Sequence, residues 1–224
     1  MIVYSNPKFT YSPQAGMQLV DAPVAGQHVV DAYTGTGEVI AVRELTRQFL
    51  LFGKPARVKR ALLFTWDEVR ANDLIFVGSE DQNLPLGQLP RLEKFNFQKI
   101  GEESVPTAVV VRNEMPAPGE KVLYVPSGHL DEGVDYAILA LTPGVSPERR
   151  VLILAGGGTY GTQAAAEFVC NPVRLAELLT KLQLRPGSRV PPFEALLEVQ
   201  VRGGAPSEPR LLLVYKRRLP EGRN

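Results

Sequence analysis

Two kinds of hydrophobic pattern alternate along the chain. Short, continuous apolar runs occupy 2–4, 74–77 and 151–155, which is typical of strands buried on both faces of a parallel sheet. Apolar residues recur at spacings of three and four in 37–52 and 163–182, and this period predicts helices. We expect the three strands to lie parallel in one sheet, with the two helical segments covering its faces.

The middle of the chain has a different pattern. Its short apolar segments are separated by Pro and Gly and show no helical period, which favours antiparallel hairpins. We therefore expect a β-rich insertion over about 84–144. Near the C-terminus, two further strands at 193–201 and 211–216 are expected to pair as a hairpin at the sheet edge. The short segments of the middle are 95–100, 108–111, 121–125 and 136–141.

Together these elements predict a single α/β domain that spans residues 1–224. Its fold class is a three-layer Rossmann-like sheet with mainly parallel core strands and an antiparallel β insertion in the middle of the chain. A length of 224 residues is also compatible with two small domains, at roughly 150 residues per domain. The alternation of strands and helices favours the single domain.

Composition and charge limit the classes of molecule that this protein is expected to bind. The formal net charge is +1, so no global field favours nucleic acid or an anionic membrane, and we expect neither to be a partner. The single Cys forms no internal disulfide, and with only two His it argues against a zinc site. We predict no membrane insertion. The first residues lack the pattern of a signal peptide, which favours the cytoplasm. A place within a longer regulatory chain stays open.

Candidate ligand-binding residues cluster in loops that follow the expected strands. Parallel strands send their outgoing loops to one edge of a sheet, so we expect the loops 34–38, 78–83 and 156–162 to line one pocket with the end of the first strand. The ligand-binding candidates are Asn6, Thr34, Gly35, Thr36, Gly37, Glu38, Ser79, Glu80, Asn83, Gly157, Gly158, Thr159, Tyr160, Gly161 and Thr162.

The clearest motif is Gly156-x-Gly158-x-x-Gly161, which follows a buried strand and precedes a helix. This is the context of a dinucleotide-binding turn, but the acid expected about 20 residues later is missing, because position 180 is Thr. Two interpretations stay open: the glycines let the helix pack closely on the sheet, or the loop binds a phosphate or carboxylate. The loop 34–38 has the same two interpretations, a helix cap or an anion site.

Carboxylate side chains are candidates for cation binding or for acid–base catalysis. Glu80, Asp81 and Asn83 could bind a divalent cation or ligand hydroxyls, or could form a solvated turn. Asp31 and Asp67 could join Glu80 in an acidic cluster for acid–base work. His28 and His129 are isolated, which favours structural roles. We predict no metal site, and the sequence leaves the cofactor unknown.

Two functions follow from these features. The first is a small-molecule binding or sensing module, with a polar and anionic ligand at the carboxyl edge of the sheet. Glycine-rich turns without a nucleophile–base pair favour it. The alternative is an enzyme that acts on a nucleotide or sugar-phosphate through carboxylates or a divalent cation. The catalytic residues are unknown, and candidates are Glu38, Asp67, Glu80 and Asp81.

Overall fold

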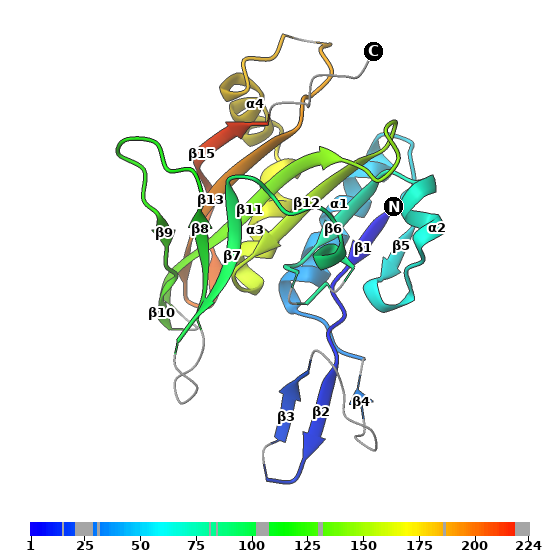
Figure 1. The fold of residues 1–224 in the computed structure, drawn as a ribbon, viewed down its shortest axis with the longest axis vertical. Coiled ribbons are helices and arrows are strands. Elements are labelled where there is room, and N and C mark those ends of the chain that lie inside the picture. The colour runs from blue at the N-terminus through cyan, green and yellow to red at the C-terminus, as the bar shows by residue number, and fades with distance from the viewer. Residues whose placement is uncertain are drawn as a thin grey trace.

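A computed structural model describes residues 1–14, 16–20, 29–30, 32–80, 82–83, 85–101, 108–129, 132–185 and 187–217 (Figure 1). The strands are β1 (Ile2–Tyr4), β2 (Phe9–Ser12), β3 (Gly16–Leu19), β4 (Val29–Val30), β5 (Val58–Arg60), β6 (Leu74–Val77), β7 (Phe95–Ile100), β8 (Ala108–Asn113), β9 (Leu123–Tyr124), β10 (Ser127–His129), β11 (Glu132–Pro143), β12 (Arg150–Gly156), β13 (Phe193–Arg202), β14 (Ala205–Pro206) and β15 (Arg210–Lys216). The α-helices are α1 (Thr36–Leu51), α2 (Trp66–Ala71), α3 (Thr159–Cys170) and α4 (Pro172–Lys181).

A curled, mixed sheet of nine strands forms the body of the molecule. Its main order is β14-β13-β11-β12-β6-β1-β5, with β10 paired to β11 and β15 paired to β13. The strands β5, β1, β6 and β12 are parallel to one another, which confirms the expected parallel alignment of 2–4, 74–77 and 151–155. From β12 outward the pairing is antiparallel, through β11, β13 and β15.

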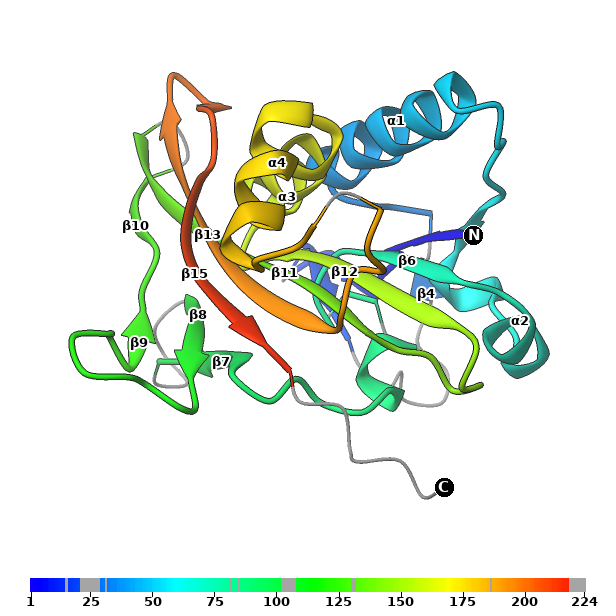
Figure 2. The same cartoon turned by 90° about the horizontal axis from the view of Figure 1, so that it is seen from above.

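The prediction of a three-layer Rossmann-like fold is wrong. Figure 2 shows α1, α3 and α4 together on one face of the sheet, while β7, β8 and β9 lie on the other face. The two predicted helical segments therefore share one face, and strands together with the short helix α2 cover the other face. The long antiparallel strands β11 and β13 also make the sheet mixed, because Ala137–Leu141 pair with Phe193–Leu197 in the middle of it.

Each face of the sheet has its own apolar core. On the helical face, Ile75, Leu139 and Leu154 pack with Leu45 and Phe168 from α1 and α3. On the opposite face, Phe76, Ile138 and Ile153 pack with Phe95 of β7 and Val111 of β8. Neighbouring residues of β6 and β11 point to opposite faces of the sheet. Because both faces are covered by a core, the sequences of these strands are continuous apolar runs.

The β-rich middle does not stay apart from the main sheet. The strands β7, β8 and β9 form a separate antiparallel sheet, but β11 lies at the centre of the large one. The described residues of 95–141 form strands and turns, as the Pro and Gly breaks predict. A third small sheet, β3-β2-β4, projects from the body (Figure 1). Among the described residues, no helix has the length and apolarity needed to cross a membrane.

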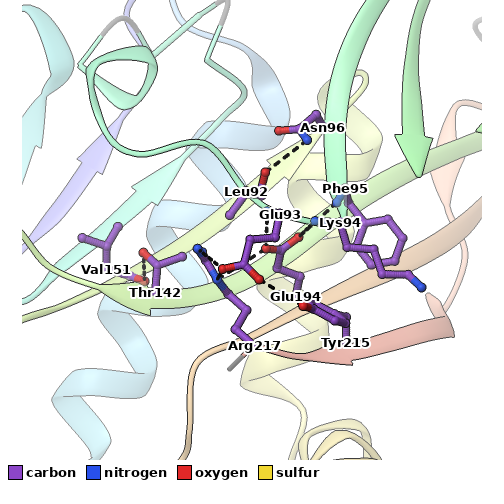
Figure 3. Close-up of polar contacts among 10 residues, drawn as sticks. All are labelled: Leu92, Glu93, Lys94, Phe95, Asn96, Thr142, Val151, Glu194, Tyr215 and Arg217. Carbon is purple, nitrogen blue, oxygen red and sulfur yellow. Dashed lines mark hydrogen bonds and ion pairs between the residues drawn. The ribbon is translucent and has the colours of Figure 1, made fainter. Parts of the chain in front are cut away.

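A buried carboxylate connects the β7–β9 layer to the main sheet. Glu194 of β13 is fully buried and accepts hydrogen bonds from the backbone N–H groups of Glu93, Lys94 and Phe95, at 2.7, 2.9 and 3.0 Å (Figure 3). Arg217 pairs with Glu93 at 2.9 Å. These contacts fix the start of β7 against the C-terminal hairpin.

Candidate functional site

The parallel part of the sheet contains a topological switch point. The chain passes from β1 through α1 to β5 on one side of β1, whereas β6, the next parallel strand, lies on the other side. In open α/β sheets, ligands bind outside the carboxyl ends of the strands at such a point. The ends of β1 and β6, with the N-terminus of α1, are therefore the candidate site.

Glu38 lies at the centre of this region. It belongs to the first turn of α1 and is only 2% exposed. A Cβ atom at Gly78, just after β6, would lie 2.7 Å from Cβ of Ser5 and 3.3 Å from Oε1 of Glu38. A Cβ at Gly35 would lie 2.1 Å from Oε2 of Glu38. Both glycines are thus needed for the close approach of the backbone to this carboxyl group.

Burial sets the protonation chemistry of Glu38. Desolvation raises the pKa of its carboxyl group above the ordinary glutamate value, because the charged form loses its hydration. The backbone N–H of Glu38 and the hydroxyls of Ser5 and Thr159 oppose this rise in pKa. Oε2 is buried and has no hydrogen-bond partner among the described residues. The capacity of Oε2 to accept a hydrogen bond is therefore unused within the described part of the chain.

The side-chain amide of Asn83 is a second buried polar group at the carboxyl ends of β1 and β6. Its Nδ2 donates to the carbonyl oxygens of Val3 and Val77, at 3.1 and 3.2 Å, and so connects β1 with β6. Its Oδ1 is also buried without a partner in the described part of the chain. The backbone N–H of Asn83 donates to the carbonyl of the buried Ser79 at 2.7 Å, which fixes the turn after β6.

The segment before α1 closes over β1. Thr34 donates from Oγ1 to the carbonyl of Ser5 at 2.7 Å, and the buried Asn6 donates from Nδ2 to the carbonyl of Tyr33 at 3.2 Å. Thr36 is exposed and Thr34 is half-buried. These two threonines therefore form the outer rim above Glu38.

The N-termini of α1 and α3 meet at Thr159. Its Oγ1 accepts a hydrogen bond from the backbone N–H of Gly37 at 2.6 Å and lies 3.4 Å from Oγ1 of Thr36. The loops 34–38 and 156–162 are thus in direct contact, and Glu38 brings them close to Gly78. The N–H of Gly37, one of the amides at the start of α1 that an anion could have bound, is used by a side chain of the protein.

Asp135 fills the corresponding position at α3. Its Oδ2 accepts from the N–H of Gly161 at 2.7 Å, and its Oδ1 accepts from the N–H of Tyr136 at 2.8 Å. Burial raises the pKa of this carboxyl group, and backbone N–H groups, including that of Gly158, oppose the rise. The glycine-rich turn thus holds an internal carboxylate. Gly157 donates to the carbonyl of Tyr136 at 2.9 Å.

The remaining candidates of the glycine-rich turn have separate positions. Thr162 is buried, accepts from the N–H of Gly156 at 3.1 Å and donates to the carbonyl of Gly158 at 3.3 Å. Tyr160 lines an open hollow of about 390 Å³ with Asp135 and Ser127. We therefore place Thr162 in the turn's own scaffold and Tyr160 beside a different surface.

The candidate carboxylates do not form a cluster in the described part of the chain. Glu80 is exposed and lines a hollow of about 40 Å³ below β7, with Phe95 and Ile153. The side chain of Asp67 is 96% exposed and lies 3.5 Å from Arg70. No group of three or more His, Cys, Asp or Glu suited to a metal ion occurs among the described residues. Asp31, Asp81, His28 and the His129 side chain lie outside the described residues.

Sequence reasoning missed Asp135, and it placed Gly78 in the pocket loop 78–83 without naming it as a binding residue. Gly78 follows a buried strand and adopts φ +100°, so its position after β6 was an available signal for a close backbone approach. Asp135 gave no such signal, because its role depends on β11 lying beside β12. Comparison with known proteins gives no significant match to a family model, a curated protein or a solved structure.

Proposed function

We propose that this chain is a small-molecule binding or sensing module whose polar ligand sits at the carboxyl ends of β1 and β6. One observation carries the proposal: Oε2 of Glu38 and Oδ1 of Asn83 are buried acceptors without a partner among the described residues. A buried polar atom without a hydrogen bond costs about 1–3 kcal/mol. A ligand that supplies the missing donors would recover this free energy.

The chemistry of the two acceptors favours a ligand with hydroxyl or amino groups. Glu38 and Asn83 require hydrogen-bond donors, and sugar and ribose hydroxyls provide them. The N–H of Gly37 at the start of α1 and the N–H of Gly161 at the start of α3 are occupied by Thr159 and Asp135. We therefore expect an anionic group of the ligand to contribute less than its hydroxyls, and we place those hydroxyls beside Glu38, below the rim of Thr34 and Thr36.

A thermal-shift screen tests this function. The panel is D-ribose, adenosine, AMP, citrate and magnesium chloride, measured on the wild type, Glu38→Gln and Glu114→Gln. Glu114 is exposed, so Glu114→Gln is a matched control for the same chemical change. We expect ribose or adenosine to stabilise the wild type and Glu114→Gln, and to have at least tenfold weaker affinity for Glu38→Gln. No shift with any compound, or equal shifts in both variants, would contradict the proposal.

A second candidate function is favoured by the protonation of Glu38. A buried carboxyl group with a raised pKa at a switch point has the properties of a general acid or base. The panel distinguishes the two functions when AMP and adenosine are incubated with the protein and magnesium chloride, and products are separated by chromatography. Conversion that is lost in Glu38→Gln and kept in Glu114→Gln supports an enzyme. Binding without conversion supports the binding module.

A further inference from the structure

An apolar cavity lies on the helical face, away from the carboxyl edge. Its volume is about 310 Å³, and its walls come from α1, α3, α4 and the sheet, among them Leu45, Phe49, Leu152, Cys170, Leu175 and Phe193. Gln48 is the lining side chain that carries an amide. The cavity is partly open to solvent, because the exposed Phe52 belongs to its lining. For comparison, an engineered apolar cavity of about 150 Å³ binds benzene. This cavity has room for a chain of about ten carbon atoms by the same measure.

A second hollow of about 310 Å³ adjoins the cavity at the opposite edge of the sheet from Glu38. Leu141 and Val190 line both spaces. The second hollow is also lined by Arg149, Arg150 and Arg189. The two spaces together therefore offer an apolar lining at one end and three arginine residues at the other.

The described lining of the second hollow contains no carboxylate, and the guanidinium of Arg150 donates to the carbonyl of Val190. Nε of Arg149 is buried and has no hydrogen-bond partner among the described residues. Burial, and then the charge of Arg189, lower the pKa of Arg150, while Asp73 opposes this. Asp73 accepts from the backbone N–H of Arg150 at 2.9 Å, and the neighbouring Glu148 is exposed. An anion in the hollow would relieve the repulsion and supply an acceptor for Arg149.

We propose that the two adjoining spaces bind one amphipathic anion, an aliphatic carboxylate of about ten carbons. Its chain lies in the apolar cavity between α1, α4 and the sheet, and its carboxylate lies among Arg149, Arg150 and Arg189. The volume sets the chain length, and the charge of the second hollow selects a carboxylate over an alcohol. This site does not depend on the proposed function of Glu38.

Isothermal titration calorimetry with three probes tests the chemical class. We expect sodium decanoate to bind saturably at one site, 1-decanol to bind at least tenfold more weakly, and sodium butyrate to show no measurable binding. Decanoate without saturable binding would overturn the proposal, as would decanol binding as tightly as decanoate. A sedimentation assay with phosphatidylglycerol vesicles tests the alternative that the arginines contact a membrane surface. If the protein sediments with the vesicles and does not bind decanoate, the proposal is overturned.

Three variants test the location. Leu175→Trp fills the cavity, whereas Val173→Trp adds the same indole to a position of α4 that is 73% exposed. We expect Leu175→Trp to weaken decanoate and decanol at least tenfold and Val173→Trp to leave both unchanged. Arg189→Gln should weaken decanoate about tenfold and spare decanol. If Leu175→Trp does not fold, Val169→Phe fills the same cavity. Equal binding in the filled and control variants would overturn the proposal.

Discussion

At the scale of single residues, Glu194 shows how one carboxylate can stabilise a layer of strands. It accepts three backbone N–H groups at the start of β7 (Figure 3). We predict that Glu194→Ala lowers the free energy of unfolding by about 3 kcal/mol, because it leaves buried donors without an acceptor. Urea denaturation measures this, with Glu198→Ala as control. Glu198 pairs with the exposed Arg210 and accepts from the hydroxyl of Tyr136 at 3.4 Å, so its loss should cost about 1 kcal/mol. Equal losses would contradict the account.

Glu38 gives a second prediction at this scale, for the dependence of stability on pH. A carboxyl group whose pKa is raised in the folded state binds its proton more tightly there. Its contribution to stability therefore falls as pH rises from the ordinary glutamate pKa through the raised value. We predict that Glu38→Gln gains stability relative to the wild type across this window, while Glu114→Gln shows no such trend. Urea denaturation between pH 4 and pH 8 measures the difference, and a flat difference would contradict it.

Single residues also show the limits of sequence reasoning about the site. The outgoing loops of parallel strands identified Asn6, Glu38, Ser79 and Asn83, which the structure gathers at the ends of β1 and β6. Glu80 has the same sequence context but points to another hollow. The direction of a loop side chain depends on the turn that carries it, and the pattern of strands does not determine that direction.

At the scale of elements, a helix cap leaves a pattern in the sequence where its two partners are close along the chain. The capping box of Thr65 and Glu68 is present at α2, and Asn171 caps α4 with Pro172 at its first position. Thr36 does not cap α1, because the cap residue is Gly35 and Thr159 from α3 accepts from the N–H of Gly37. A cap supplied by a distant element leaves no local pattern.

Asp135 provides a test of such a distant cap. Its carboxylate accepts from the N–H of Gly161 in the first turn of α3. We predict that Asp135→Ala lowers the free energy of unfolding by about 1 kcal/mol and speeds hydrogen exchange at the Gly161 amide. Asp67→Ala, in the first turn of α2 with a side chain that is 96% exposed, should change stability by less than about 0.5 kcal/mol. Unchanged exchange at Gly161 after Asp135→Ala would contradict the capping role.

At the scale of the whole molecule, the sequence predicts the parallel strands but does not predict which elements cover each face of the sheet. Continuous apolar runs identify β1, β6 and β12, because both faces of these strands are buried. The same pattern does not tell whether helices or strands cover the second face. The run 136–141 was assigned to the insertion because Gly and Pro flank it, yet β11 lies at the centre of the main sheet.

The shared central strands make a prediction about cooperativity. The two apolar cores lie on opposite faces of β6, β11 and β12, so loss of one core exposes the strands that support the other. We predict a single unfolding transition. Fluorescence of Trp66, the only tryptophan, and far-ultraviolet circular dichroism should give the same urea midpoint. Two separate midpoints would show that the β7–β9 layer or α2 unfolds independently.

The most direct test of the polar site is a nuclear magnetic resonance titration with D-ribose and adenosine. The probes should shift the side-chain amide of Asn83 and the backbone amides of Gly35, Gly37 and Gly78 in the wild type. The same shifts should be lost in Glu38→Gln and kept in Glu114→Gln, because the carboxylate of Glu38 is the acceptor at the centre of the site. Absence of shifts at these amides with both probes, or the same shifts in Glu38→Gln, would contradict a ligand site at the ends of β1 and β6.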